Sequence, residues 1–231
     1  MEPTPANPLA ALLFLYDKVL HRPLSRIEGV VLARRAKRLP VVLTPQEVHA
    51  LLSFLEGTTR LIVELLYGSG VRLMECICPR VKDIDFGFKN ITVREGKGKV
   101  DRLTMLPEVV FDSLQRHLKW AKNVHDKDLP RDFGRVQIPY ALARKYPNAD
   151  REWCWQFVFP ASRSYFDPEA QTRRRNHIHE TVVQRAVHQA ARRAGITKHV
   201  GCHTMAIRLQ LILCPMVMIF GPFRNCWGTK A

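Results

Sequence analysis

The apolar positions that follow residue 44 repeat at helical spacing. Thr44, Pro45 and Glu47 combine an N-cap residue, a proline at the first helical position and an acidic residue at the third, which together form a helix start signal. Apolar side chains then recur every three or four positions. The pattern therefore predicts a helix over about 45–55.

A second apolar run, residues 61–66, is followed by two glycines. The run is predicted to break at Gly68 and Gly70, because glycine interrupts helices and favours turns. Helical spacing then resumes at Arg72 in a short helix that is expected to end near Pro79. Arg72 is thus expected directly after a glycine turn.

Residues 90–95 and 102–106 are rich in β-forming side chains and flank the sequence EGKGK. This arrangement predicts an antiparallel hairpin with Lys97 and Lys99 at its tip. Combined with the helices, the hairpin gives the expected fold class: mostly α with a small antiparallel β-sheet, that is, α+β.

Two more helices are predicted, from 107 to about 122 and from about 177 to 194, the second ending at Gly195. The second helix is expected to bury the apolar residues that share one register, which are Ile178, Val182, Ala186, Ala190 and Ala194. Between the two helices lies the unusual segment IPYALARKYPNADREWCWQFVFP at 138–160, followed by a polar loop with the basic run Arg173-Arg174-Arg175.

The start of the chain has a helical pattern of its own. Residues 8–20, PLAALLFLYDKVL, carry apolar side chains at helical spacing and precede a basic linker, RAKRLP. This piece is expected to be the last part of an earlier domain.

The composition points to a polyanionic partner. Lys and Arg number 36 against 21 Asp and Glu, which gives a net charge of +15 and a pI near 10. Such self-repulsion is usually tolerated because the protein binds nucleic acid. The alternative is a basic surface that binds no polyanion specifically, as in a ribosome-associated or tail-rich protein. An apolar content of 46% is ordinary for a folded chain.

No metal, cofactor or secretion signal is expected. The six cysteines lack paired CxxC spacing. The chain does not open with the basic region, apolar core and cleavage site of a signal peptide. A reduced bacterial cytoplasm is therefore expected. Cys76 and Cys78 are two residues apart in a predicted helix and point to different faces. His179 and Glu180 resemble the start of a zinc-protease motif, but Val183 stands where its second histidine would be.

Three residues form a set suited to phosphoryl transfer without a metal. Arg72 can match the non-bridging oxygens of a phosphodiester, Lys97 can donate a proton to the leaving oxygen, and His203 can assist proton movement. The alternative for each residue alone is structural, because glycine-arginine turns and lysine-tipped hairpins are often solvated surface.

In order and spacing these residues resemble the tyrosine recombinases. YGSGVRLMECICPRVKDIDF resembles the family's first arginine box, EGKGKVDRLTMLP its lysine hairpin, and AGITKHVGCHT the approach to its HxxR box. The 138–160 segment resembles the extra segment of integron integrases, and NPLAALLFLYDKVL resembles the end of their core-binding domain. The resemblance covers nearly all of residues 8–204.

The resemblance implies a tyrosine recombinase catalytic domain that cleaves and rejoins DNA through a 3′-phosphotyrosyl intermediate, with no cofactor. Arg72 would bind the scissile phosphate, Lys97 would protonate the leaving oxygen and His203 would support proton transfer. The expected DNA backbone contacts are Lys99, Arg102, Arg173, Arg174 and Arg175. For the arginine run the alternative is a solvated loop. The expected partners are double-stranded or folded single-stranded DNA and further copies of the chain on DNA, with no membrane.

The sequence departs from the family after Met205. The family's second arginine is absent, since Ala206 follows and Arg208 is five residues from His203 rather than three. If one cytosine is restored after the Met205 codon, the tail can be read as Arg-His-Ser-Phe-Ala-Thr-His, as in the family. A single-nucleotide frameshift is therefore inferred.

The expected organisation has three parts. Residues 1–38 are a core-binding domain remnant and linker, 39–205 a catalytic domain incomplete at its C-terminus, and 206–231 an out-of-frame tail. The chain would thus be truncated at both ends and would lack the nucleophilic tyrosine. Residues 209–220 are apolar but too short to span a membrane. Three functions stay open: an inactive DNA-binding remnant, a recombinase with an unusual nucleophile, and a non-functional product.

Overall fold

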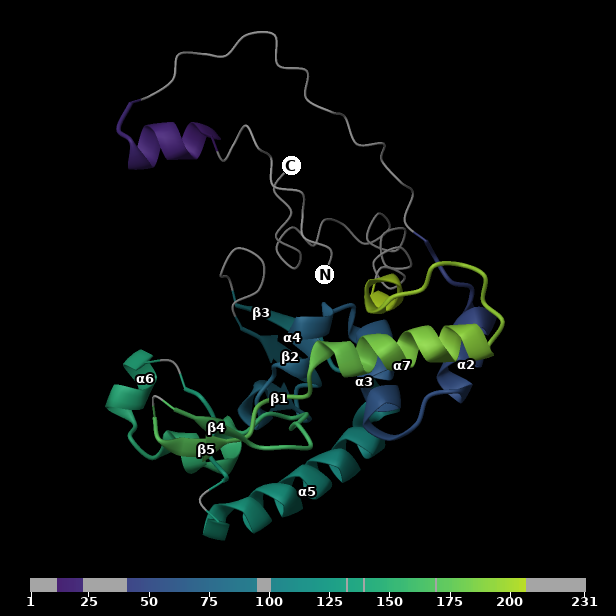
Figure 1. Ribbon diagram of the computed structural model, residues 1–231. Helices are drawn as coiled ribbons and strands as arrows, with labels where there is room; N and C mark the ends of the chain where they lie inside the picture. The colour runs from purple at the N-terminus through teal and green to yellow at the C-terminus, as the bar shows by residue number, and fades with distance from the viewer. Residues whose placement is uncertain are drawn as a thin grey trace. The chain divides into compact units, whose positions relative to one another are not determined.

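A computed structural model describes residues 12–22, 41–94, 101–131, 133–138, 140–168 and 170–206, without the side chains of 140 and 141 (Figure 1). The chain divides into two units, residues 1–39 and 40–231. In the first unit residues 12–19 are helical, ending in the π-helical turn Leu15–Val19, so the described part of the predicted N-terminal helix is helical.

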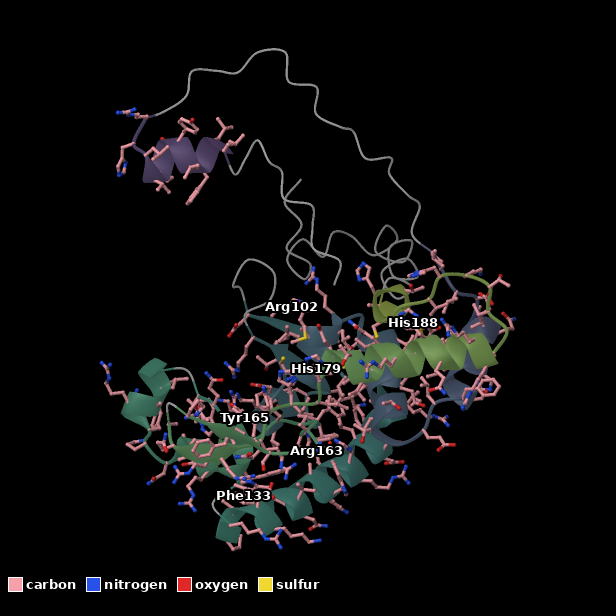
Figure 2. All side chains as sticks on the ribbon, viewed as in Figure 1. Arg102, Phe133, Arg163, Tyr165, His179 and His188 are labelled. Atoms are coloured by element: carbon pink, nitrogen blue, oxygen red, sulfur yellow. The ribbon has the colours of Figure 1, made fainter. Side chains whose placement is uncertain are left out.

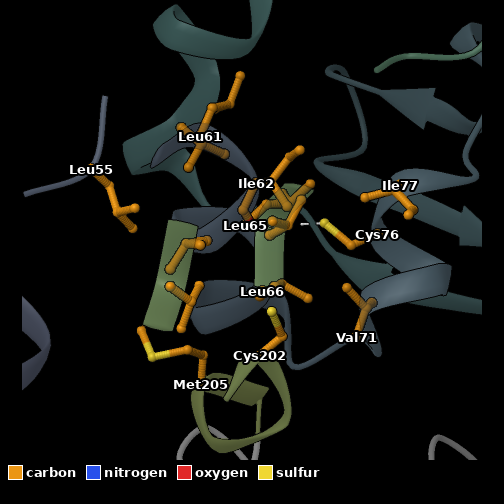
Figure 3. Close-up of a cluster of buried hydrophobic side chains, with 14 of the residues drawn as sticks. Leu55, Leu61, Ile62, Leu65, Leu66, Val71, Cys76, Ile77, Cys202 and Met205 are labelled. Atoms are coloured by element: carbon orange, nitrogen blue, oxygen red, sulfur yellow. Dashed lines mark hydrogen bonds between the residues drawn. The ribbon is translucent and has the colours of Figure 1, made fainter. Parts of the chain in front are cut away.

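The core of the second unit is built from helices. They are α2 (Pro45–Ser53), α3 (Gly57–Ser69), α4 (Leu73–Ile77), α5 (Phe111–Asp128) and α7 (Glu180–Arg193). Helix α7 packs on α2, α3 and α4 (Figure 1). Figure 3 shows their shared apolar cluster, in which α3 supplies Leu61, Ile62, Leu65 and Leu66. At this apolar content the burial of these side chains is the main stabilising contribution.

The predicted start of α2 is confirmed. The Glu47 backbone N–H donates to Thr44 Oγ1 at 3.2 Å, and the Thr44 N–H donates to Glu47 Oε2 at 2.7 Å. Two backbone donors that the helix cannot satisfy internally are thereby paired.

The predicted break at Gly68 is wrong, because α3 continues through it to Ser69. A Cβ atom at Gly68 would lie 2.4 Å from Cγ of Pro107, so glycine is needed there for close packing. The turn is made by Gly70 alone, whose φ of 65° lies in the left-handed region.

The predicted hairpin is confirmed by strands β2 (Asn90–Val93) and β3 (Arg102–Met105). They pair antiparallel, with Val93 opposite Arg102, and β1 (Ile84–Asp85) completes a sheet of order β1-β2-β3. The hairpin tip, with Lys97 and Lys99, lies outside the described residues. Because Val93 and Arg102 are the last pair before the tip, Arg102 marks its base.

The helix predicted over 107–122 is longer than expected. A 3-10 helix, Glu108–Val110, leads into α5, which extends to Asp128, and a further 3-10 turn, Leu129–Arg131, follows. The His117 side chain on α5 is buried, and its Nε2 lies 3.0 Å from the Val158 carbonyl oxygen.

The 138–160 segment folds into three short helices, α6 (Tyr140–Lys145), Ala149–Arg151 and Trp153–Trp155. It has a small apolar cluster of its own, in which Val136, Ile138 and Ala149 pack with Leu142, Trp155 and Phe157. The expected polar loop after it is a hairpin, β4 (Tyr165–Asp167) and β5 (Thr172–Arg174).

The predicted register of α7 is only partly correct: Ala190 is buried, and Ile178 and Ala186 pack against the core. The helix buries Val183, Val187, Ala190 and Ala191, whereas Val182 is 45% exposed. A strict four-residue repeat drifts around a helix by about 40° at each step, so the five residues of the prediction cannot share one face. The fold class, α+β and mostly helical, is confirmed. No helix of the described ranges is long and apolar enough to cross a membrane.

Candidate active site

Arg72 stands between α3 and α4 with an extended backbone, directly after the Gly70 turn. Its backbone N–H donates to Glu75 Oε2 at 2.9 Å and its Nη1 donates to Glu75 Oε1 at 2.8 Å. The Arg72 side chain remains 53% exposed, so one edge of the guanidinium is fixed while the rest faces solvent. This is a suitable arrangement for binding an anion.

Arg102 binds the same carboxylate from the hairpin base. Its Nη2 donates to Glu75 Oε2 at 2.7 Å and its Nη1 to Oε1 at 3.1 Å. Glu75 is 10% exposed and Arg102 19%. Two guanidinium groups thus share one carboxylate, and the cluster keeps one net positive charge. Figure 2 shows Arg102 near the described end of the hairpin.

The pKa of Glu75 reflects both its burial and its hydrogen bonds to the two arginines. Burial of the carboxyl raises its pKa, but the hydrogen bonds from Arg102 and from the backbone and side chain of Arg72 lower it to about 2. Glu75 is therefore ionised throughout the physiological range and holds both arginines in place.

His203 lies in the helical turn of residues 202–206, with its side chain exposed. The neighbouring Cys202 thiol is buried, which raises its pKa to about 11. Burial and then the nearby Cys202 also raise the pKa of the Cys76 thiol, which is one turn of α4 beyond Arg72. Figure 3 shows both cysteines at the core cluster. The turn that carries His203 thus packs against the same core as α4, although no hydrogen bond joins Arg72 and His203 among the described residues.

The arginine run at 173–175 is neither a solvated loop nor uniformly exposed. Arg174 on β5 pairs with Asp167 at 3.2 Å. Arg175 binds Asp128 at the end of α5 through two hydrogen bonds, at 2.6 and 3.1 Å, and donates to the Ala161 carbonyl at 2.5 Å. Arg173 is exposed, with its Cζ 5.1 Å from the centre of the Phe133 ring. Arg173 is therefore the most exposed member of the run.

Two carboxylates, Glu75 and Asp128, bind arginines of the predicted sites although neither was predicted from the sequence. The position of Glu75 could have been noticed in the sequence, because an acidic residue three positions after the N-cap of a helix can bind the N-cap backbone. No such local pattern marks Asp128, since its partner Arg175 is far away in the chain. His179, which resembles the start of a zinc-protease motif in the sequence, is the N-cap of α7 and accepts a hydrogen bond from the Thr181 backbone N–H. Within the described ranges, no three histidines, cysteines or acids are grouped as metal ligands.

Comparisons with known proteins identify the family of the chain. The phage integrase family matches residues 41–209. An integrase/recombinase of Escherichia coli and another of Pseudomonas aeruginosa are each 46% identical over 197 residues, which is 85% of this chain. The chain spans 58% of the length of these two relatives. The tyrosine recombinase XerA of Thermococcus kodakarensis is 40% identical over 86 residues, 36% of this chain and 30% of that protein.

The fold is also found in a solved structure. The XerH site-specific recombinase bound to difH substrate aligns with a TM-score of 0.50 and 18% identity, covering 90% of this chain and 53% of that one. At that identity the likeness extends to the fold alone.

Proposed function

The chain belongs to the phage integrase family, and on that premise we propose that it derives from a site-specific recombinase of the integron integrase type and binds DNA at recombination sites. The observation that carries the proposal is the cluster of Arg72, Glu75 and Arg102 at the base of the lysine hairpin. One carboxylate orients two guanidinium groups, of which Arg72 stays open to a phosphate.

The proposed chemistry follows from the charge that develops on a phosphodiester. In the intact family, a tyrosine phenol gives up its proton as it forms a 3′-phosphotyrosyl bond, the bond from phosphorus to the 5′ oxygen breaks, and that oxygen takes a proton. Arg72 stabilises the non-bridging oxygens, Lys97 supplies the proton and His203 supports the transfers. Lys99 and Arg173 contact the DNA backbone, and further copies of the chain assemble on the same DNA.

We also propose that this chain does not complete strand cleavage. Ala206, where the resemblance calls for a second arginine, is buried at the end of the 202–206 turn. Loss of one preorganised charge donor commonly lowers the rate about 10²- to 10³-fold. The inferred frameshift also removes the nucleophile, and with it the covalent route. The remaining activity is then DNA binding.

Mobility shifts over a salt series test the binding proposal. The probes are a short duplex and a folded single strand with unpaired bases. Binding is expected to weaken steeply as salt rises, because phosphate contacts release counterions. Arg72→Ala should weaken it more than Arg163→Ala, which removes one exposed arginine away from the cluster (Figure 2). The absence of any shift at low salt contradicts the proposal.

A suicide substrate tests the loss of cleavage. The substrate traps the covalent intermediate, so the wild-type chain should give no SDS-resistant adduct with DNA. Formation of such an adduct overturns the proposed inactivity and favours a recombinase with an unusual nucleophile.

A further inference from the structure

The first halves of α3 and α5 lie beside each other (Figure 1) and leave a groove of about 750 Å³ that is open to solvent. Residues 57–64 of α3 and 113–120 of α5 border it, each over about 10 Å of helix. Its lining includes Arg60, Leu61 and Glu64 from α3, and Arg116, His117 and Trp120 from α5. The members of each set recur at helical spacing, so each helix presents one stripe to the groove.

The groove lies away from the candidate active site. It borders the start of α3 at Gly57, whereas Arg72 follows the end of that helix at Ser69. A helix of this length spans about 18 Å. A short helix bound in the groove would therefore leave the cluster of Arg72, Glu75 and Arg102 free.

Trp120 is an exposed aromatic side chain with rigid support. It is 48% exposed, and its ring centre lies 5.2 Å from that of His117. The His117 ring lies in turn 5.0 Å from Phe159, which is 1% exposed, and His117 Nε2 lies 3.0 Å from the Val158 carbonyl oxygen. Burial lowers the pKa of His117, so its ring is uncharged at neutral pH. Because a row of rings anchored in the core supports Trp120, a partner that covers it loses little entropy by fixing it.

The groove has further apolar surface on its α3 side and at the start of α5. Leu61 is buried at its lining, and Val109, which precedes α5, lines it while 88% exposed. A valine and a tryptophan exposed to this degree along one groove form an apolar surface that a partner can cover.

The charged side chains that line the groove leave one positive charge uncompensated. Arg60 Nε donates to Glu64 Oε1 at 2.8 Å, so these two charges are paired. Arg116 Nη2 donates to Ser113 Oγ at 3.3 Å, and within the described ranges no acidic residue forms an ion pair with Arg116. A partner with one acidic group beside an apolar surface would therefore complement the groove.

We propose that the groove between α3 and α5 binds an amphipathic helix of a partner protein, whose apolar face covers Trp120 and whose acidic residue pairs with Arg116. Two helical stripes that line one groove hold a third helix through apolar residues at i, i+4 and i+7, and a groove of about 10 Å matches two turns. Tryptophan and arginine are the residues that most often dominate binding at protein interfaces. Duplex DNA is a poorer match, because Glu64 would repel its phosphates. This site does not depend on the DNA binding proposed above.

Fluorescence anisotropy with a labelled peptide tests the site in the full chain. The probe is a capped helical peptide with leucine at i, i+4 and i+7 and one glutamate beside them, and its matched control has glutamine in place of the glutamate. Trp120→Ala should weaken binding of both peptides at least about tenfold. Arg116→Gln should weaken binding of the glutamate peptide about fivefold and leave the glutamine peptide nearly unchanged. Arg163→Gln removes an exposed arginine elsewhere and should change neither.

The outcomes separate the proposed partner from other occupants. Failure of the wild-type chain to bind the glutamate peptide, or unchanged binding in Trp120→Ala, overturns the site. Equal effects of Arg116→Gln on the two peptides overturn the acidic character of the partner. Displacement of the peptide by duplex DNA assigns the groove to DNA instead, and a dimer in sedimentation that Trp120→Ala dissociates assigns it to a second copy. Peptide binding by a chain that binds no DNA supports the site while contradicting the proposed function.

Discussion

Arg102 binds the Glu75 carboxylate with both of its terminal nitrogens, at 3.1 and 2.7 Å. This contact joins the hairpin base to α4, and Arg72 completes it from the other side. Because both arginines are held by the ionised carboxylate, the geometry of the candidate active site should depend on pH.

Stability should fall in acid because of Glu75. The pKa of this carboxyl is about 2 in the folded chain, against an ordinary value of 4.5. Its contribution is therefore present above pH 4.5 and is lost as the pH falls from 4.5 toward 2, with a full size on the order of 3 kcal/mol. Urea unfolding at several pH values measures it.

The matched variant is Glu75→Gln, which should lose about 2 kcal/mol at neutral pH and show a flatter acid dependence. An acid dependence equal to that of the wild type would show that other carboxyls account for it.

The Arg175–Asp128 pair should be essential for stability rather than for DNA binding. Both side chains are largely buried, so Arg175→Met leaves the Asp128 carboxylate unpaired and should cost about 3 kcal/mol of unfolding free energy. Arg173→Met should change stability by less than about 0.5 kcal/mol, but should reduce the salt dependence of DNA binding. Thermal unfolding and mobility shifts measure the two effects. Equal stability losses would contradict the assignment.

The register of α7 can be tested with two neighbouring valines. Val183 is fully buried and Val182 is 45% exposed. Val183→Ala leaves a cavity and should cost about 2 kcal/mol, whereas Val182→Ala should change stability by less than about 0.5 kcal/mol. Chemical denaturation of the two variants compares them. The reverse order would restore the register predicted from the sequence.

Repair of the proposed frameshift should restore cleavage. One cytosine inserted after the Met205 codon of the gene brings the second arginine into position and opens the downstream frame. The repaired protein should form an SDS-resistant adduct with a suicide substrate. The same repair combined with Arg72→Ala should give little or no adduct, since the phosphate then lacks its first guanidinium. A repaired chain that forms no adduct counts against the frameshift.

The local features of the fold were accessible from the sequence. The start of α2 at Thr44, the turn at Gly70 before Arg72 and the β2–β3 hairpin depend on residues within a few positions of one another. Capping, backbone freedom and strand alternation act over that range. The helices and the place of Arg72 were therefore predicted, while the roles proposed for Lys97 and His203 remain predictions.

The tertiary structure decided which side chains are paired. Arg80 reaches Gln137 and Trp155, and Arg175 reaches Asp128, across separations at which spacing carries no signal. The close approach of Gly68 to Pro107 and the buried face of α7 have the same origin. An arginine looks the same in a sequence whether it faces solvent or a carboxylate. Its partner is fixed only when distant segments pack together and their buried polar groups must be satisfied.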